Sequence, residues 1–252
     1  MTAPGARRPA QLEIAVQDAA GARIAFAAGA DRVELCQALA ETGGLTPSAG
    51  AVDAVLAEAG SADRLAVLVR PRPGGFVYDA AEVAVVAADV RDVVRRGAGA
   101  VVVAALDAAG QVDVDALRRW TDAAVGAEVV FHRAIDTLAD PVGVVDLLAE
   151  LGISRVLTSG GATRSIDGLG TIEALVRRSA GRVQIMPGGG VRVGDISALV
   201  SAGADAVHLS ARRASGDTAP SGPGGGASGF DVTDAAIVVA ARAALDGVAS
   251  GR

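Results

Sequence analysis

Short apolar runs alternate with longer amphipathic stretches along the whole chain. Eight of the apolar runs are predicted as β-strands, because near-continuous apolar character is typical of strands that are buried on both faces. These strands cover residues 12–16, 32–36, 65–70, 100–106, 128–132, 155–159, 182–187 and 205–210. An Ala-rich helical stretch follows each strand, near residues 18–28, 47–59, 79–96, 113–125, 140–151, 165–180, 192–202 and 231–246.

A glycine stands just before four of the predicted strands, at Gly29, Gly97, Gly152 and Gly203. Glycine after a helix adopts the left-handed conformation without a Cβ penalty, so this repeated joint indicates serial strand–helix units. Eight units in 252 residues fit the usual size of a closed barrel. We predict an α/β protein with a single (β/α)8 TIM-barrel domain over residues 10–252. An open doubly wound sheet is the alternative, although no GxGxxG segment follows the first strand.

Two segments depart from the pattern of strands and helices. Residues 1–9 are predicted to be a disordered N-terminal tail. We expect no signal peptide, because no apolar region follows the two arginines there. Residues 214–229 are dominated by Gly, Pro and Ser. This composition predicts a flexible loop between the last strand and the last helix, with a lid over the barrel mouth as the alternative.

Composition narrows the classes of function. A net charge of −6 without a basic block, together with few aromatic residues, argues against a nucleic-acid partner. Every apolar run of membrane-spanning length contains glycine breaks or charges, so we expect no membrane partner. The single cysteine excludes an intrachain disulfide and fits a reducing, cytoplasmic location. The absence of lysine excludes Schiff-base chemistry, and two histidines cannot form a three-histidine zinc site.

Charged residues gather where the predicted strands end, which is where a barrel of this kind builds its site. Residues two apart share a strand face, so Glu34 lies on the face of Cys36, while Arg70 and His132 end two further strands. If these faces point inward, a carboxylate, a guanidinium and an imidazole meet in the barrel. Glu34 or His132 is the candidate general base, and Asp136 is a third catalytic candidate. An ion-pair network that closes the barrel without chemistry is the alternative.

Glycine-rich turns follow the sixth and seventh strands, as TSGG and MPGGG. Glycines let the backbone approach an anion closely, and backbone N–H groups attract phosphate. Tight turns that need positive φ are the alternative. The predicted anion-binding residues are Arg70, Arg72, Ser159, Gly160, Gly161, Gly188, Gly189 and Gly190.

Two kinds of metal site are alternatives to the predicted anion site. Cu(I) prefers thiolate and thioether ligands, which makes Cys36 and Met186 candidates, although both residue types also serve as core hydrophobes. A divalent metal could instead use His132, His208 and carboxylates. The cofactor therefore stays unknown from the residues alone.

Seven motifs occur in a fixed order between residues 12 and 212: GADRVELC, GGLTPS, RPRPGGFVY, FHRAID, LTSGG, MPGGGV and VHLSAR. On these motifs the chain resembles the CutC copper-homeostasis family. The resemblance implies a (β/α)8 barrel, a cytoplasmic location and a homo-oligomer. It also implies an association with copper tolerance, with copper as a cofactor or ligand bound through cysteines.

The chain departs from the family pattern where copper would bind. Ala15 stands where members often carry a cysteine and Gln17 where an aspartate is usual, so Cys36 is the remaining candidate metal ligand. Two hypotheses follow. The protein is a copper-homeostasis protein that binds copper weakly, or it is an enzyme for a small anionic or phosphorylated metabolite at the barrel mouth.

Overall fold

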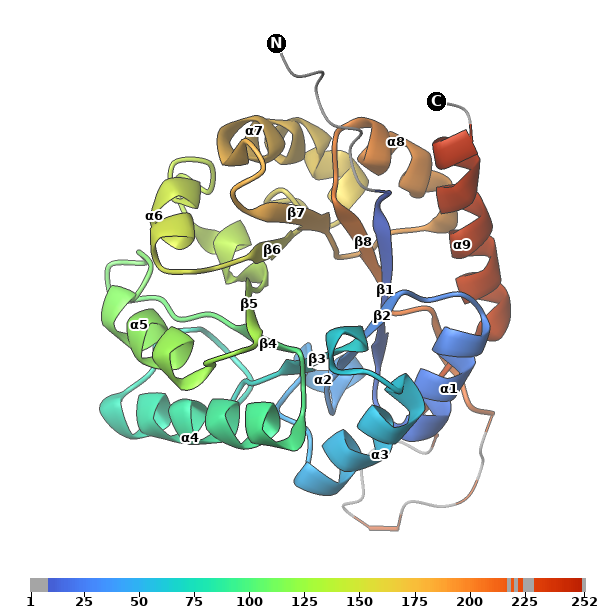
Figure 1. The fold of residues 1–252 in the computed structure, drawn as a ribbon, viewed down its shortest axis with the longest axis horizontal. Helices are drawn as coiled ribbons and strands as arrows, with labels where there is room; N and C mark the ends of the chain where they lie inside the picture. The colour runs from blue at the N-terminus through green and yellow to red at the C-terminus, as the bar shows by residue number, and fades with distance from the viewer. Residues whose placement is uncertain (1–8, 217–218, 220–221, 224–228, 251–252) are drawn as a thin grey trace.

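Eight parallel strands form a ring with the helices outside it, as Figure 1 shows for the computed structural model. The structure describes residues 9–216, 219, 222–223 and 229–250. Around the ring the strands follow the order β7-β6-β5-β4-β3-β2-β1-β8. Their bounds are β1 (Gln11–Val16), β2 (Arg32–Leu35), β3 (Leu65–Leu68), β4 (Ala100–Val103), β5 (Glu128–Phe131), β6 (Arg155–Thr158), β7 (Gln184–Pro187) and β8 (Ala206–Leu209).

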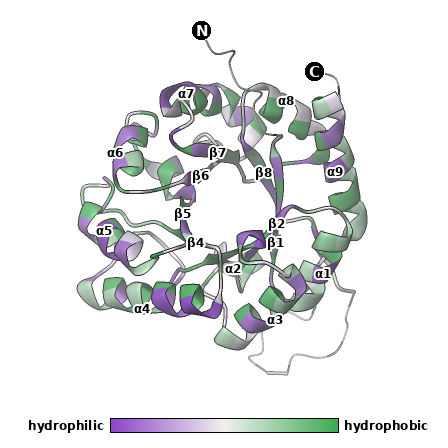
Figure 2. Cartoon of the chain, in the orientation of Figure 1, coloured by the Kyte–Doolittle hydropathy of each residue, from purple (hydrophilic) through white to green (hydrophobic). Residues whose placement is uncertain are grey.

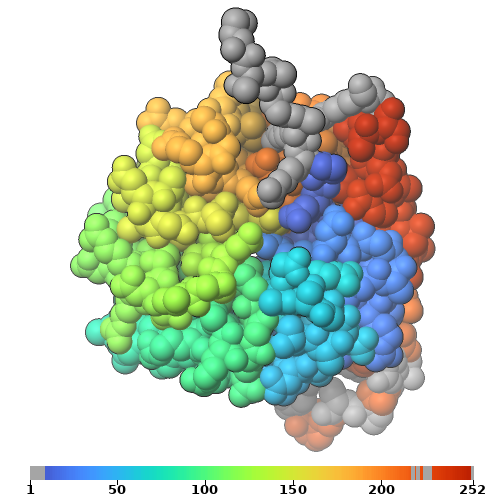
Figure 3. Space-filling view, viewed as in Figure 1, coloured from blue at the N-terminus to red at the C-terminus, as the bar shows by residue number. Residues whose placement is uncertain are grey.

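The first and last strands of the barrel complete the ring. β1 pairs in parallel with β8, with Glu13 opposite His208. Between β7 and β8, Gly188 forms a bridge to His208, and the Asp205 backbone N–H donates to the Ile185 carbonyl at 2.9 Å. In the space-filling view the chain runs once around the molecule from the blue to the red end (Figure 3). The predicted (β/α)8 barrel is confirmed, and the open doubly wound sheet is excluded.

The predicted helices are present, with one clear error. The helix predicted from residue 231 begins at residue 235, because Asp231–Thr233 form β10, which pairs antiparallel with β9 (Arg212–Ala214). Ala214, the first residue of the predicted 214–229 loop, belongs to β9, and much of the rest of that loop lies outside the described residues. Residues 1–8 of the predicted tail also lie outside them. The α-helices are α1 (Ala19–Ala27), α2 (Leu39–Thr42), α3 (Ala49–Ala59), α4 (Ala80–Arg96), α5 (Val114–Ala123), α6 (Val145–Glu150), α7 (Leu169–Ser179), α8 (Ile196–Ser201) and α9 (Ala235–Ser250). Short 3-10 segments are η1 (Ala62–Arg64), η2 (Arg133–Thr137), η3 (Ser165–Gly168) and η4 (Val193–Asp195).

Local sequence signals fix where the longest helix begins and ends. The Asp79 carboxylate accepts the Glu82 backbone N–H at 2.8 Å, while the Glu82 carboxylate accepts the Asp79 N–H, which forms a capping box. At the other end Gly97 adopts a φ of 112°, the left-handed conformation that its place before a strand predicts. Figure 2 shows hydrophilic and hydrophobic colouring on each of the outer helices, as expected for helices with one buried face.

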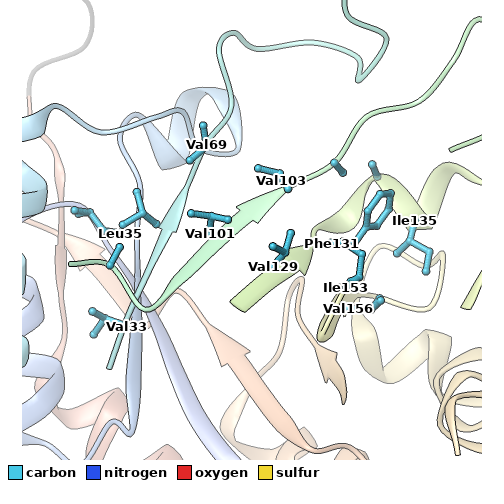
Figure 4. Packing of buried hydrophobic residues seen from close by; sticks show 14 of the residues in the cluster. Val33, Leu35, Val69, Val101, Val103, Val129, Phe131, Ile135, Ile153 and Val156 are labelled. Carbon is cyan, nitrogen blue, oxygen red and sulfur yellow. The ribbon is translucent and has the colours of Figure 1, made fainter. Parts of the chain in front are cut away.

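Strand alternation divides the core into two layers. The outer layer lies between strands and helices, and Figure 4 shows part of it, with Val33 from β2, Val101 from β4 and Phe131 from β5. The inner layer lies inside the ring and is smaller. Its buried apolar members are Cys36, Ala66, Leu68, Ala100, Val102, Val130, Leu157, Met186 and Ala206. Along each strand, the charged residues occupy the positions between residues of the outer layer, so their side chains also point into the barrel.

Candidate functional site

A cavity of about 680 Å³ opens where the strands end and the following loops begin. Residues from seven strand ends or their loops line it, so the cavity occupies the usual catalytic face of a barrel. The predicted site residues that line it are Glu34, Arg70, His132, Asp136, Gly161, Gly189 and Gly190. His208, Arg133 and Arg212 line it as well.

Five predicted site residues are not among those that line the cavity. The Arg72 side chain turns to Glu82, with which it forms a salt bridge, and it donates to the Val77 carbonyl at 2.8 Å. Ser159 is fully buried. Cys36 is fully buried in the inner layer. Neither Gly160 nor Gly188 reaches the cavity wall. The structure therefore separates Arg70 from Arg72, which their spacing had grouped together.

A buried ion-pair cluster, formed by Glu13, Arg32, Arg155 and Glu128, occupies the barrel near the strand starts. The Glu13 carboxylate is fully buried, and its Oε2 accepts from Arg32 Nε. Arg32 Nη1 also contacts Glu128 Oε2 at 2.8 Å, and Arg155 Nη1 lies 4.0 Å from Glu13 Oε2. Burial opposes ionisation, but the Arg32 charge and a His208 hydrogen bond hold the pKa of Glu13 well below its usual range. Each buried charge here has an opposite partner.

His208 connects this cluster to the cavity. Its Nδ1 lies 2.8 Å from Glu13 Oε1, and its Nε2 lies 3.7 Å from Glu34 Oε2. Although burial acts the other way, these two carboxylates raise the pKa of His208. Burial raises the pKa of Glu34 to about 7, with the His208 charge opposing and the Glu13 charge adding to the shift. Glu34 is thus a carboxyl that gains and loses its proton near neutral pH.

Arg70 is a buried cation whose partners are neutral. Its side chain donates from Nη1 to the carbonyls of Thr42 at 2.8 Å and Gly44 at 3.1 Å, and from Nη2 to the carbonyl of Gly74. The residue is 7% exposed, and its Nε has no hydrogen-bond partner among the described residues. Within that same part of the chain, no carboxylate forms a salt bridge with Arg70. Its positive charge therefore faces the cavity uncompensated.

His132 lies at the start of the short η2 helix. Its Nδ1 accepts the backbone N–H of Ala134 at 3.2 Å, so a neutral ring carries its proton on Nε2. Nε2 is buried and has no partner among the residues that the structure describes. Burial, followed by the nearby Arg70 charge, lowers the pKa of His132 to about 3. The side chain is therefore a neutral hydrogen-bond donor at neutral pH.

Asp136 organises the loop rather than presenting a free carboxylate. Its oxygens accept from Thr158 Oγ1 at 2.5 Å, from the Ser159 N–H at 3.0 Å and from the Gly161 N–H at 3.2 Å. It also accepts from Arg133 Nε at 2.9 Å. With so many donors attached, Asp136 is better suited to holding Arg133 than to moving protons.

Gly189 lets the Arg133 guanidinium lie against the backbone. A Cβ atom at this position would come within 2.8 Å of Arg133 Cζ, and its φ of 111° also favours glycine. Across the described residues, the backbone N–H groups of Gly189 and Gly190 have no acceptor. They supply hydrogen-bond donors beside a cation, which is the combination that binds anions.

The donor set does not fit copper. Burial, with a contribution from the Glu34 charge, raises the pKa of the Cys36 thiol, whereas a Cu(I) ligand must be a thiolate. The Cys36 Sγ lies 3.9 Å from the Val16 carbonyl, and the Met186 sulfur accepts from Arg155 Nη1 at 3.7 Å. No group of three or more His, Cys, Asp and Glu side chains able to hold a metal occurs among the described residues. The structure therefore does not support the alternative of a divalent metal at His132 and His208.

The sequence prediction did not include the buried partners of these site residues. Arg32 and Arg155 were not assigned a role, although each lies two residues before an inward residue, Glu34 and Leu157 respectively. Alternation alone could have placed both arginines inside the barrel. The FHRAID motif after the fifth strand places Arg133 at the mouth, but a 3-10 turn rather than strand alternation sets its direction.

Comparison with known proteins identifies relatives of the chain. Residues 10–213 match the model of the CutC family. A family protein CutC from Xanthomonas axonopodis is 50% identical over 202 residues, which cover 80% of this chain and 83% of that protein. A family protein CutC from Caulobacter vibrioides is 41% identical over 190 residues, covering 75% of this chain and 76% of that protein.

Solved structures agree on the fold. CutC from Streptococcus agalactiae, whose name carries the words copper homeostasis, is 30% identical with a TM-score of 0.75, over 80% of this chain and 98% of that one. Thiamine phosphate pyrophosphorylase from Pyrococcus furiosus is 12% identical with a TM-score of 0.59, over 94% of this chain and 96% of that one, and shows the fold alone. None of the helices within the described residues is long and apolar enough to cross a membrane.

Proposed function

The chain belongs to the CutC family. We propose that this protein is an enzyme that binds and converts a small anionic metabolite in the cavity at the barrel mouth. The observation that carries the proposal is Arg70, a buried guanidinium beside the cavity whose hydrogen bonds go to main-chain carbonyls. A buried charge is costly unless an opposite charge accompanies it. A negatively charged ligand in the cavity would supply that charge.

Further donors around the cavity support an anion. Arg133 is held in place by Asp136 and Ser159 and lies against the backbone of Gly189, which Gly190 follows in the chain. Guanidinium groups and free backbone N–H groups recognise carboxylate and phosphate oxygens. The cavity volume of about 680 Å³ suits a small metabolite.

Two groups beside the anion site are suited to chemistry. Glu34 has a pKa of about 7, the range in which a carboxylate serves as a general base under physiological conditions. His132 presents an unpartnered polar atom. Perturbed groups in a cleft are typical of active sites, and here they come with a binding group for substrate.

The test compares two arginines that lie two positions apart. Isothermal titration with 2-phosphoglycolate should show binding to the wild type and to Arg72→Met, because Arg72 lies outside the cavity wall. Arg70→Met should weaken the affinity at least tenfold. Equal losses in both variants, or no binding of this anion to the wild type, would contradict the proposal.

Copper handling, which the family name implies, is the competing function. It would rest on Cys36, and the buried thiol with its raised pKa gives it no support. We expect Cu(I) titration to give the same weak affinity for the wild type and for Cys36→Ala. A loss of tight Cu(I) binding in Cys36→Ala would restore the copper function. A cytoplasmic location and a homo-oligomer remain predictions from the family resemblance.

A further inference from the structure

The two reactive side chains of the cavity have different hydrogen-bond states. His132 Nδ1 is occupied by the Ala134 N–H, which leaves Nε2–H as a donor without an acceptor among the described residues. Among the described residues, the Glu34 carboxyl accepts no hydrogen bond, and His208 Nε2 lies 3.7 Å from its Oε2. One side chain can therefore give a hydrogen bond to a substrate oxygen, while the other can take a proton.

The barrel places these side chains on different sides of the same cavity. Glu34 lies on β2, and His132 directly follows β5, three strand positions away around the ring. Figure 1 shows β2 and β5 across the barrel opening from each other. Both residues line the same cavity.

Building on the proposed function, we propose that the cavity enolises an anionic carbonyl compound, with Glu34 as the base and His132 as the donor to the carbonyl oxygen. Glu34 removes a proton from the carbon next to the carbonyl group. The C–H electron pair forms the C=C bond, and the carbonyl π electrons move to the oxygen, which accepts the His132 Nε2–H hydrogen bond. The Glu34 carboxylic acid then returns its proton to the same carbon or to the neighbouring one. No oxidant, reductant or second substrate is needed.

The opposite assignment, with His132 as the base, conflicts with its surroundings. A base needs a free lone pair, and the lone pair of Nδ1 is already used by Ala134. The His132 and Arg70 side chains both contact the ring of Phe76. A second proton on His132 would therefore place a positive imidazole close to the positive guanidinium of Arg70. A neutral imidazole donor facing a carboxylate base is an established arrangement for enolisation.

The groups around Glu34 allow it to act as a base. His208 from β8 faces it directly, Glu13 from β1 contacts the other nitrogen of His208, and Arg32 precedes it on β2. Glu13 is committed to Arg32 and His208, so it fixes the position of His208. His208 is accordingly a positioning residue, and Glu34 is the residue that meets the substrate.

The inference is tested with a matched pair of ligands, phosphoglycolohydroxamate as a mimic of the enediolate and 2-phosphoglycolate as its carboxylate counterpart. The wild type should bind the hydroxamate at least tenfold more tightly, because the site is complementary to the enolised form. Glu34→Gln and His132→Phe should abolish this preference while changing the 2-phosphoglycolate affinity less than threefold. Arg70→Met should weaken both ligands.

The outcomes separate this inference from the proposed function. Equal affinity of the wild type for the two ligands would overturn the enolisation and leave the anion site standing. Failure of both ligands to bind would overturn the proposed function and the enolisation with it. A preference that survives in Glu34→Gln would also overturn the assigned base.

A second measurement leaves Glu34, Arg70 and His132 unchanged. The chain has two histidines, so ¹⁵N-labelled His208→Gln leaves the His132 ring as a single imidazole in the NMR spectrum. We expect a neutral ring with the proton on Nε2 from pH 5 to pH 8, following its pKa of about 3. A charged ring, or a proton on Nδ1, would overturn the proposal.

Discussion

Two groups of buried charges in the same barrel differ in how completely their members are paired. The buried ion-pair cluster of Glu13, Arg32, Arg155 and Glu128 lies near the strand starts and pairs its charges with opposite ones, although Arg32 Nη2 has no hydrogen-bond partner among the described residues. A mouth cluster of Glu34, Arg70 and His132, at the strand ends, leaves a cation without a carboxylate and two nitrogens without a described partner. The comparison indicates that charge near the strand starts supports the fold, whereas charge at the mouth is arranged for a ligand.

Breaking the ion-pair cluster should have the largest effect on stability. Glu13→Gln removes the carboxylate between Arg32 and Arg155 and leaves both guanidinium groups buried with less negative charge. We expect the free energy of unfolding to fall by about 3–5 kcal/mol in chemical denaturation. Glu128→Gln is the matched control, because this partner of Arg32 is 47% exposed and should cost less than about 1 kcal/mol. Similar losses in both variants would remove the distinction between buried and exposed pairing.

Glu34 in the mouth cluster should make stability depend on pH between 4.5 and 7. The pKa of Glu34 is about 7 in the folded protein and ordinarily 4.5, so the folded state keeps a proton that the unfolded chain has lost. Its stabilising contribution is complete below pH 4.5 and is lost as the pH rises through 7. Relative to Glu34→Gln, the wild type should therefore lose on the order of 3 kcal/mol across that window. Urea denaturation at half-unit pH steps measures the difference, and parallel stability profiles would contradict it.

Removing the unpaired cation should cost less stability than breaking the ion-pair cluster. Arg70→Met breaks hydrogen bonds to the Thr42, Gly44 and Gly74 carbonyls but leaves no opposite charge behind. We expect a loss of about 1–2 kcal/mol, smaller than for Glu13→Gln, together with the loss of anion binding described above. A loss as large as that of Glu13→Gln would show that the mouth cluster also supports the fold.

The identity of the inward residues could be read from the chain, but their partners could not. Alternation placed Glu34, Arg70 and His132 inside the barrel, and all three line the cavity. The RPRPGG segment after the third strand also led us to group Arg72 with Arg70 as anion-binding residues, yet the loop after β3 turns Arg72 away to Glu82. A side chain in a loop follows the local backbone path, which no simple periodicity describes.

The sequence by itself determined the barrel, its family and which side chains enter its interior, because strand alternation and the glycine joints are local properties of the chain. Tertiary structure decided which charges are neutralised. Glu13 meets His208 because β1 pairs with β8, across 195 positions of sequence. That pairing completes one group of charges, while no strand brings a carboxylate to Arg70 among the described residues. Register across a closed ring is a long-range property, so only the folded barrel distinguishes the paired charges from those left for a ligand.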